Sequence, residues 1–241
     1  MRVSCLKVCL LVLLAGGFAS AQAVEKPAAG EERLDQNAAQ DVLKKLKETF
    51  AAQGSLRAHI LTETFSDLTN KTTKKEGDLL IQRPDKMLQL YTKPAASLQM
   101  LDGAQAMRQE AGEKSLLVGD FTKAPKKLSQ VHAMVTGDLT TLTELFEISV
   151  FRAAAAEGKP AQYRIVLNLL PKKKLEFTRI QIRVADGEAC FQEVVRETAD
   201  GNTVTDKFSA VQVGEIPAKE FSAPIEGKEK DVKEISDEAP K

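Results

Sequence analysis

Histidine, cysteine and paired carboxylate side chains are the groups in this sequence that could carry catalysis or hold a metal ion. The two histidines, His59 and His132, each lack a second ligand at the short spacing of zinc and copper sites. Cys190 has no nucleophile signature around it, and the G-x-S-x-G pattern of serine hydrolases does not occur. Paired carboxylates fall in charged turns, where solvation accounts for them. We therefore predict a protein that is not an enzyme and that needs no metal or other cofactor.

The balance of basic and acidic residues indicates which kinds of partner the protein can bind. Basic and acidic residues are equal in number, with 34 of each. Nucleic-acid binding needs a basic excess or stripe, because phosphate contacts supply much of its affinity. The basic runs 123–127 and 172–174 fall at expected turns, where they are either solvated or dock on an acidic partner or membrane surface. The sequence therefore argues against nucleic acid as a partner.

Burial of an apolar ligand is the chemistry that the stretch from Gly77 to Gly103 suggests. Its apolar segments are separated by Pro84, Pro94 and an Asp-Gly turn, which predicts three consecutive antiparallel strands. Such strands would form the centre of a sheet.

Alternation within these strands predicts an apolar surface with a cation at its rim. Leu79, Ile81 and Arg83 share one face of the first strand. The second strand is apolar on both faces, which carry Met87, Gln89 and Tyr91, and Leu88 and Leu90. A soluble sheet does not need apolar surface on both sides. Either a helix covers the second side or an apolar molecule binds there.

The first 23 residues have the features of a signal peptide. Arg2 and Lys7 make the start positive, an apolar run follows at 10–15, and small residues allow cleavage near Ala21 or Ala23. The run is shorter than the roughly 18 apolar residues of a membrane-spanning helix. We therefore expect a mature protein that is exported and lacks this segment.

The remaining chain divides into one domain and a tail. Residues 24–225 have a length that all-β barrels often use as a single domain. Residues 226–241 contain ten charges and few apolar side chains. We predict that these last residues form a charged, disordered tail, because they cannot bury enough apolar surface to stay ordered.

One amphipathic helix is predicted over residues 36–53, after a linker at 24–32. Its apolar positions recur at three- and four-residue spacing, and Gly54 follows its end. These positions are Ala39, Val42, Leu43, Leu46 and Phe50. The stripe either packs permanently on the core or lies across the mouth of a half-open barrel as a movable cover.

Alternating and β-branched segments predict strands along the rest of the chain. Beyond the central stretch they cover 55–66, 104–109, 115–118, 163–170, 177–184, 189–197 and 204–213. A polar turn is expected at 67–75, and two short helices are expected within 128–146.

The order of motifs resembles the LolA-like family of periplasmic lipoprotein carriers. The pattern is G-x-L-x-x-x-R-P, then a strand ending in Tyr-x-x-Pro, then a strand closed by Asp-Gly. Its residues are Gly77, Leu79, Arg83, Pro84, Tyr91, Pro94, Asp102 and Gly103. The later motifs D-G-N-T at 200–203 and F-S-A-P at 221–224 follow the same family order. Where the family usually has a tryptophan two residues before the tyrosine, this sequence has Gln89.

The resemblance implies a mainly β fold with a few helices (α+β), an unclosed antiparallel half-barrel covered by short helices. It implies a monomeric carrier that binds the acyl chains of a lipid or lipoprotein and moves them toward the outer membrane. An inner-membrane donor complex and an outer-membrane acceptor would be its partners. The alternative is an envelope sensor or binding module of the same fold that recognises lipids or misfolded envelope proteins.

The resemblance also implies a set of site residues. The expected cavity wall consists of Leu79, Ile81, Met87, Tyr91, Leu98 and Met100, and the expected cover consists of Val42, Leu46 and Phe50. In the family, the arginine matched by Arg83 faces the cavity mouth and bonds to backbone carbonyls of the covering elements. From the sequence alone, these apolar residues could equally form an ordinary core, and Arg83 could be a solvated rim residue.

Overall fold

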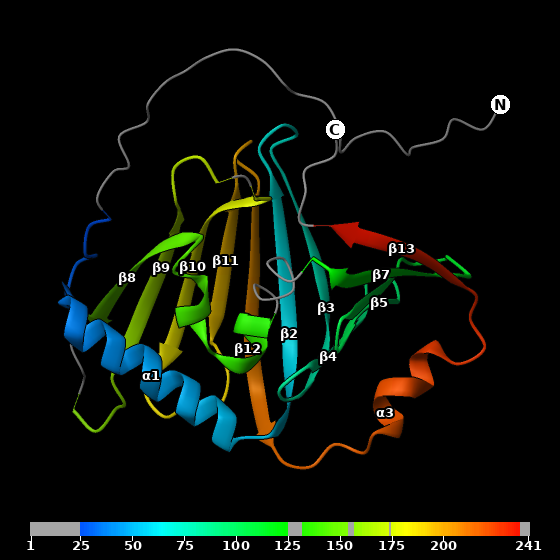
Figure 1. The fold of residues 1–241 in the computed structure, drawn as a ribbon, viewed down its shortest axis with the longest axis horizontal. Coiled ribbons are helices and arrows are strands. Elements are labelled where there is room, and N and C mark those ends of the chain that lie inside the picture. The colour runs from blue at the N-terminus through cyan, green and yellow to red at the C-terminus, as the bar shows by residue number, and fades with distance from the viewer. Residues whose placement is uncertain (1–24, 125–131, 154–156, 174, 237–241) are drawn as a thin grey trace.

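The structure is a computed structural model, and it describes residues 25–124, 132–153, 157–173 and 175–236 (Figure 1). The expected signal peptide, residues 1–23, lies outside the described residues. Within those ranges, no helix has both the length and the apolar character that crossing a bilayer requires.

A single curved sheet dominates the described part of the chain. Its thirteen strands follow the order β1-β8-β9-β10-β11-β12-β2-β3-β4-β5-β6-β7-β13. Their bounds are β1 Glu31–Arg33, β2 Ser55–Ser66, β3 Lys71–Gln82, β4 Lys86–Lys93, β5 Ser97–Asp102, β6 Gln105–Gln109, β7 Leu116–Lys123, β8 Phe146–Ala153, β9 Gln162–Leu169, β10 Phe177–Ala185, β11 Glu193–Thr198, β12 Thr203–Val213 and β13 Lys230–Ser236. In Figure 1, β5 and β7 run across the direction of β2 and β3, so the sheet curls. The predicted unclosed, mainly antiparallel half-barrel is confirmed.

The predicted amphipathic helix is confirmed as α1, Gln36–Ala52. Its first turn is capped by Asp35, whose carboxylate accepts a hydrogen bond of 2.9 Å from the N–H of Ala38. The other helical pieces are residues 132–136, η1 Leu139–Leu142, α3 Lys219–Ser222 and η2 Ala223–Ile225. The first two of these fall where short helices were expected.

The β2–β3 hairpin forms the long spine of the sheet. The two strands pair without interruption from Ser55 opposite Gln82 to Ser66 opposite Lys71. The polar turn between them is therefore shorter than the predicted 67–75. Residues 71–75 are polar but still form part of β3, because their backbone groups complete the hydrogen-bonded ladder with β2. This pairing outweighs the low strand propensity of their side chains.

Two strands at the other side of the sheet were not predicted. β8 alternates, with Phe146 and Val150 in the core, but the preceding helical pattern obscured it. β1 falls within the predicted linker and pairs with β8 through only three residues. A strand this short leaves almost no pattern in the sequence.

The prediction of a disordered tail from residue 226 onward is wrong for Lys230–Ser236. These residues form β13, which pairs in parallel with β7 (Figure 1). Val232 is 59% exposed, so apolar burial contributes little at that position. Backbone hydrogen bonds to the β7 edge supply the order instead, and they require no apolar pattern.

The sheet buries apolar side chains on both of its faces. We call the face under α1 the inner face and the opposite face the outer face. Two inner clusters adjoin, one centred on α1 and β8–β11 and the other on β2 and β3. The outer cluster joins Leu80, Leu88, Leu98, Met100, Met107, Leu116 and Val118.

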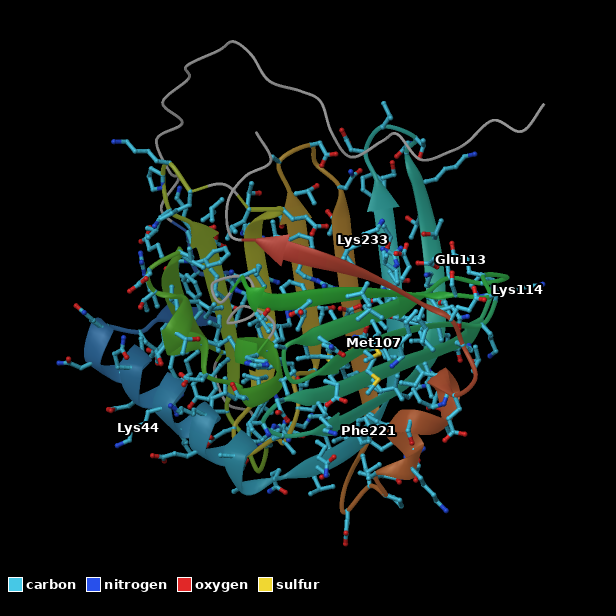
Figure 2. All side chains as sticks on the ribbon, turned by 45° about the vertical axis from the view of Figure 1, so that its right-hand side comes forward. Lys44, Met107, Glu113, Lys114, Phe221 and Lys233 are labelled. Carbon is cyan, nitrogen blue, oxygen red and sulfur yellow. The ribbon has the colours of Figure 1, made fainter. Side chains whose placement is uncertain are left out.

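The C-terminal segment covers the outer cluster. Ile216 and Phe221 are buried in it, and Ile225 packs against it. Figure 2 labels Met107 in the sheet and Phe221 in the segment that contains α3. An ion pair between Arg57 and Glu220 also joins this segment to β2. The second apolar side of β4 is therefore covered by the chain itself, which is the first of the two alternatives that its sequence left open.

Candidate functional site

Helix α1 covers the inner face of the half-barrel. It lies across the ends of β8, β9 and β10 in Figure 1. Leu43, Leu46 and Phe50 on this helix are buried, and the Phe50 ring lies 5.0 Å from that of Phe191, centroid to centroid. Burial stabilises such side chains by roughly 1.5–3 kcal/mol each, so this stripe supplies most of the attachment of α1.

A second covering piece is formed by residues 132–142, which pack beside α1. Ala133, Leu139 and Leu142 join the same inner cluster as α1. Gly137 sits between them with a φ of +72°, and a Cβ placed there would lie 2.8 Å from the Phe50 ring. Glycine is needed at this position both for the backbone conformation and for the close approach of Phe50.

Arg83 joins three covering elements through one side chain. Its Nε donates to the carbonyl oxygen of Val135 at 2.9 Å, its Nη1 to that of Gln53 at 2.9 Å and its Nη2 to that of Ala189 at 2.8 Å. These acceptors belong to the second covering piece, the end of α1 and the β10–β11 connection. The fork of guanidinium donors allows one cation to reach all three at once.

The surroundings of Arg83 are largely apolar. Burial lowers the pKa of its guanidinium, because the charged form loses water. The ring of Phe50 lies 4.7 Å from the guanidinium carbon. Three backbone oxygens and one aromatic face thus replace the solvent around the charge.

Two surface ion pairs add to the attachment of α1. Lys45 Nζ lies 2.8 Å from a carboxylate oxygen of Asp186, and Lys47 Nζ lies 2.7 Å from one of Asp138. Both lysine side chains are more than half exposed, and an ion pair with such an exposed partner stabilises by about 1 kcal/mol at most. These ion pairs therefore contribute to the orientation of α1 more than to the free energy of its attachment.

Most of the predicted site residues lie together on the inner face. Leu79, Ile81 and Tyr91 belong to the inner cluster on β2 and β3, and Met87 packs against it. Leu46 and Phe50 are buried in the neighbouring cluster, and Val42 packs on it. Alternation predicted which residues share a face within β3 and within β4, and the ladder between the two strands brings both sets to the inner face.

The placement of Leu98 and Met100 in this wall is wrong. Both lie in the outer cluster, since Leu98 pairs with Leu90 and Met100 with Leu88. Leu101, the neighbour of Met100, faces inward instead. The alternation within β5 was correct, but the choice of face depended on its register with β4, which the sequence does not fix.

Several inner residues were missed as site residues. Leu56, Ala58 and Ile60 on β2 belong to the same cluster as Leu79, and Phe208 on β12 packs against it. The alternation of β2 was visible in the sequence and could have identified its three residues. Phe208 offered no comparable signal, because β12 is otherwise mostly polar.

The inner face is filled by the side chains of its own cover. A small hollow that is open to solvent lies beside α1 and is lined partly by Val42, Leu46 and Tyr163. An acyl chain could enter the inner face only by displacing α1 or the second covering piece.

Cys190 lies directly beside this contact network. Its thiol is buried, and burial raises its pKa to about 12. It follows Ala189, whose carbonyl oxygen accepts from Arg83. The thiol therefore stays protonated and shielded while the cover is in place.

The comparisons with known proteins agree with this architecture. The family model described as "Outer membrane lipoprotein carrier protein LolA" matches residues 58–224. No curated protein sequence matches the chain.

Solved structures with low sequence identity resemble it. An uncharacterized conserved protein from Thermus thermophilus is 7% identical with a TM-score of 0.53, and the match covers 81% of this chain and 99% of that one. A LolA superfamily protein from Nitrosomonas europaea is 13% identical with a TM-score of 0.42, covering 76% and 96%. A chain of the MucA/MucB complex of Pseudomonas aeruginosa is 12% identical with a TM-score of 0.42, covering 76% and 59%.

The Thermus protein shares the fold, and the family model spans more than half of the chain. The chain therefore belongs to the LolA family.

Proposed function

We propose that this protein is a periplasmic carrier that holds the acyl chains of a lipid or lipoprotein against the inner face of its half-barrel. The carrier domain would begin at residue 24, include β13, and be exported by the segment 1–23. It would receive its cargo from an inner-membrane donor complex and pass it to an outer-membrane acceptor. The function requires binding and release and no bond-breaking chemistry.

The observation that carries this proposal is the way in which Arg83 ties the cover. The end of α1, the second covering piece and the β10–β11 connection meet at one side chain through three backbone carbonyls. Loss of this cation's contacts would weaken the attachment of all three elements together, although the buried stripe of α1 would still pack on the sheet. Covering elements that share one tie can loosen as a unit, as a reversible carrier needs.

The energetics of acyl transfer favour such an arrangement. Each buried methylene contributes roughly 0.8 kcal/mol, so a chain of about fourteen carbons would lose roughly 11 kcal/mol on passing into water. A carrier must offer a comparable apolar surface. Leu43, Leu46 and Phe50 fill that surface in the closed state, and a guest chain would take their place.

Binding of a dye-labelled fatty acid tests the proposal directly. We expect saturable binding at micromolar concentration, and competition by unlabelled lipids with acyl tails. The same titration with α1 cross-linked to the β10–β11 connection, through Lys45→Cys and Asp186→Cys, should show much weaker binding. Equal binding by the open and the cross-linked protein would place the lipid elsewhere and reject the proposal.

A transfer assay with donor and acceptor membranes tests the role of Arg83. We expect Arg83→Leu to change the rate at which bound lipid or lipoprotein is released. Arg183→Leu is the matched control, because Arg183 lies on the outer face with only a 3.5 Å contact to Glu193. A sensor of the same fold would bind the lipid but pass none of it to the acceptor.

A further inference from the structure

A series of connected polar side chains interrupts the apolar inner face next to the apolar part of β2. Thr62 donates to a carboxylate oxygen of Asp206 at 2.6 Å, and its Oγ1 lies 2.8 Å from the hydroxyl of Tyr91. Because the single Thr62 proton goes to Asp206, the Tyr91 hydroxyl can donate either to Thr62 or to the Oε1 of Gln89, which lies 3.4 Å away. Arg196 completes the series by an ion pair with Asp206. We call these four residues the polar group.

The polar group lies at the opposite end of the apolar inner face from Arg83. Leu56, Ala58 and Ile60 lie along β2 on the same face as Thr62. At about 3.3 Å per residue, Thr62 lies roughly 20 Å along the strand from Leu56. Ser55, just before Leu56, pairs with Gln82 beside Arg83. An acyl chain along β2 would therefore have Arg83 near one end and the polar group near the other.

Each cation around Tyr91 already has a carboxylate partner. Arg196 pairs with Asp206, and Lys75 Nζ lies 3.1 Å from a carboxylate oxygen of Glu110. Lys75 Nζ also lies 5.5 Å from the centroid of the Tyr91 ring. Arg108 also donates to Glu110, at 2.7 Å from its Nε, so an anionic guest would have to compete with Asp206 or Glu110 for a cation that is already paired.

Two buried polar atoms on this surface have no hydrogen-bond partner. They are the Oγ of Ser97 and the Nε of Arg196, and no other side-chain atom in the described ranges shares this condition. Ser97 lies directly opposite Tyr91 in the β4–β5 ladder. Buried polar groups are ordinarily paired, so two unpaired donors near one tyrosine need an explanation. Both atoms can donate a hydrogen bond to an acceptor supplied by a guest.

We propose that Ser97, Arg196 and Tyr91 mark a subsite for the uncharged polar head of the guest, an ester or amide whose carbonyl oxygens accept from the unpaired donors. The tail of the guest then runs along β2 toward Arg83. This inference rests on the proposed acyl binding and specifies the head chemistry and the orientation. A free carboxylate would bring an unpaired negative charge next to Asp206 and Glu110, where burial makes it unfavourable.

Competition between two lipids with the same tail tests the subsite. A monoacylglycerol and the corresponding fatty acid each displace a dye-labelled fatty acid from the wild type, and we expect the monoacylglycerol to bind more tightly. Ser97→Ala and Arg196→Lys should each reduce that preference about fivefold, the loss expected for one hydrogen bond. Arg196→Lys keeps a cation for Asp206 and removes the Nε–H. Ser149→Ala, a buried serine of the outer face that accepts from Arg33, is the matched control.

The outcomes separate this inference from the proposed function. If both lipids bind the wild type equally, or if both variants retain the full preference, the subsite is rejected while acyl binding stands. If neither lipid binds the wild type, both proposals fail. Circular dichroism of each variant checks that a changed preference is not caused by unfolding, and Ser97→Ala carries the test by itself if Arg196→Lys does not fold.

Discussion

The guanidinium of Arg83 covers the ring of Phe50 and at the same time binds the carbonyl oxygen of Gln53, which directly follows α1. One side chain thus secures both the last buried aromatic of the helix and the backbone at its end. Arg83 itself is held in place by its backbone N–H, which donates to Gly54 at 2.7 Å. The cover and the strand that ties it are therefore anchored to each other within a few residues.

Replacing Arg83 by leucine should loosen α1 more than the sheet. Three hydrogen bonds from a charged donor are lost, and we expect a fall of about 2–4 kcal/mol in the free energy of the local opening of α1. Amide exchange measured by mass spectrometry should become at least about tenfold faster in α1 and at 132–136, with little change in β2 and β3. Uniform acceleration across the whole chain would contradict the role of Arg83 as a local tie.

Alanine substitutions at two adjacent positions of β5 should show which face of the sheet binds the lipid. Met100 and Leu101 are both buried, but Met100 faces outward and Leu101 inward. Each change to alanine should cost about 2–5 kcal/mol of stability in denaturant titrations. We expect only Leu101→Ala to weaken the binding of a labelled fatty acid. A comparable loss in Met100→Ala would mean that the outer face takes part.

Gly77→Ala should be among the most damaging small substitutions in the sheet. A Cβ at this position would lie 1.9 Å from the carbonyl oxygen of Leu90, so β3 and β4 could not keep their spacing. We expect a loss of about 3 kcal/mol or more in thermal or chemical unfolding. Gly54→Ala is the control, because a Cβ there would meet nothing within 4 Å. Similar stability of the two variants would argue against the close approach of these strands.

Cys190 should report on the opening of the cover. With its pKa raised to about 12 by burial, the thiol is protonated and inaccessible in the closed state. We expect slow modification by an uncharged maleimide in the wild type and faster modification in Arg83→Leu or when lipid is bound. Cys190→Ser supplies the background from other thiols. If the rate of maleimide modification is the same in the wild type, in Arg83→Leu and in the presence of lipid, then opening of the cover does not expose the β10–β11 connection.

Acid should release the N-terminal segment from the outer face. Arg164 binds Glu31 through two nitrogens and pairs with Glu25, and the Arg164 hydrogen bond holds the pKa of Glu31 below its ordinary value of 4.5. This contribution to stability is complete above pH 4.5 and is lost as the pH falls through the lower, folded-state pKa. Glu31→Gln should flatten that part of the curve of unfolding free energy against pH, whereas Glu32→Gln at an exposed neighbouring position should not. Parallel curves for the wild type and Glu31→Gln would exclude this pair as a cause of acid sensitivity.

The sequence predicted the architecture best where alternation and turn residues agree. The helix over 36–53 and the strand over 55–66 match α1 and β2 to within one residue. Alternation also placed Leu79 with Ile81 on one face of β3, and Met87 with Tyr91 on one face of β4. These features are local, so a single stretch of sequence contains the information that determines them.

Features that depend on distant partners were harder to predict. The inward or outward orientation of Leu98 is set by its pairing with Leu90 and not by its own strand. β13 is ordered by the edge of β7, which lies more than a hundred residues earlier in the chain. The hydrogen bonds of Ala189 and Val135 with Arg83 likewise join remote segments, and only the family resemblance suggested them.

The strands at the two margins of the sheet, β1 and β13, bear on how copies of this protein meet. β1 consists entirely of charged residues, and exposed charges on β13 include Lys230, Asp231 and Lys233. Open strand edges invite other chains to add to them, and charged side chains discourage this addition. The charged margins thus protect an unclosed sheet from indefinite growth into fibrils.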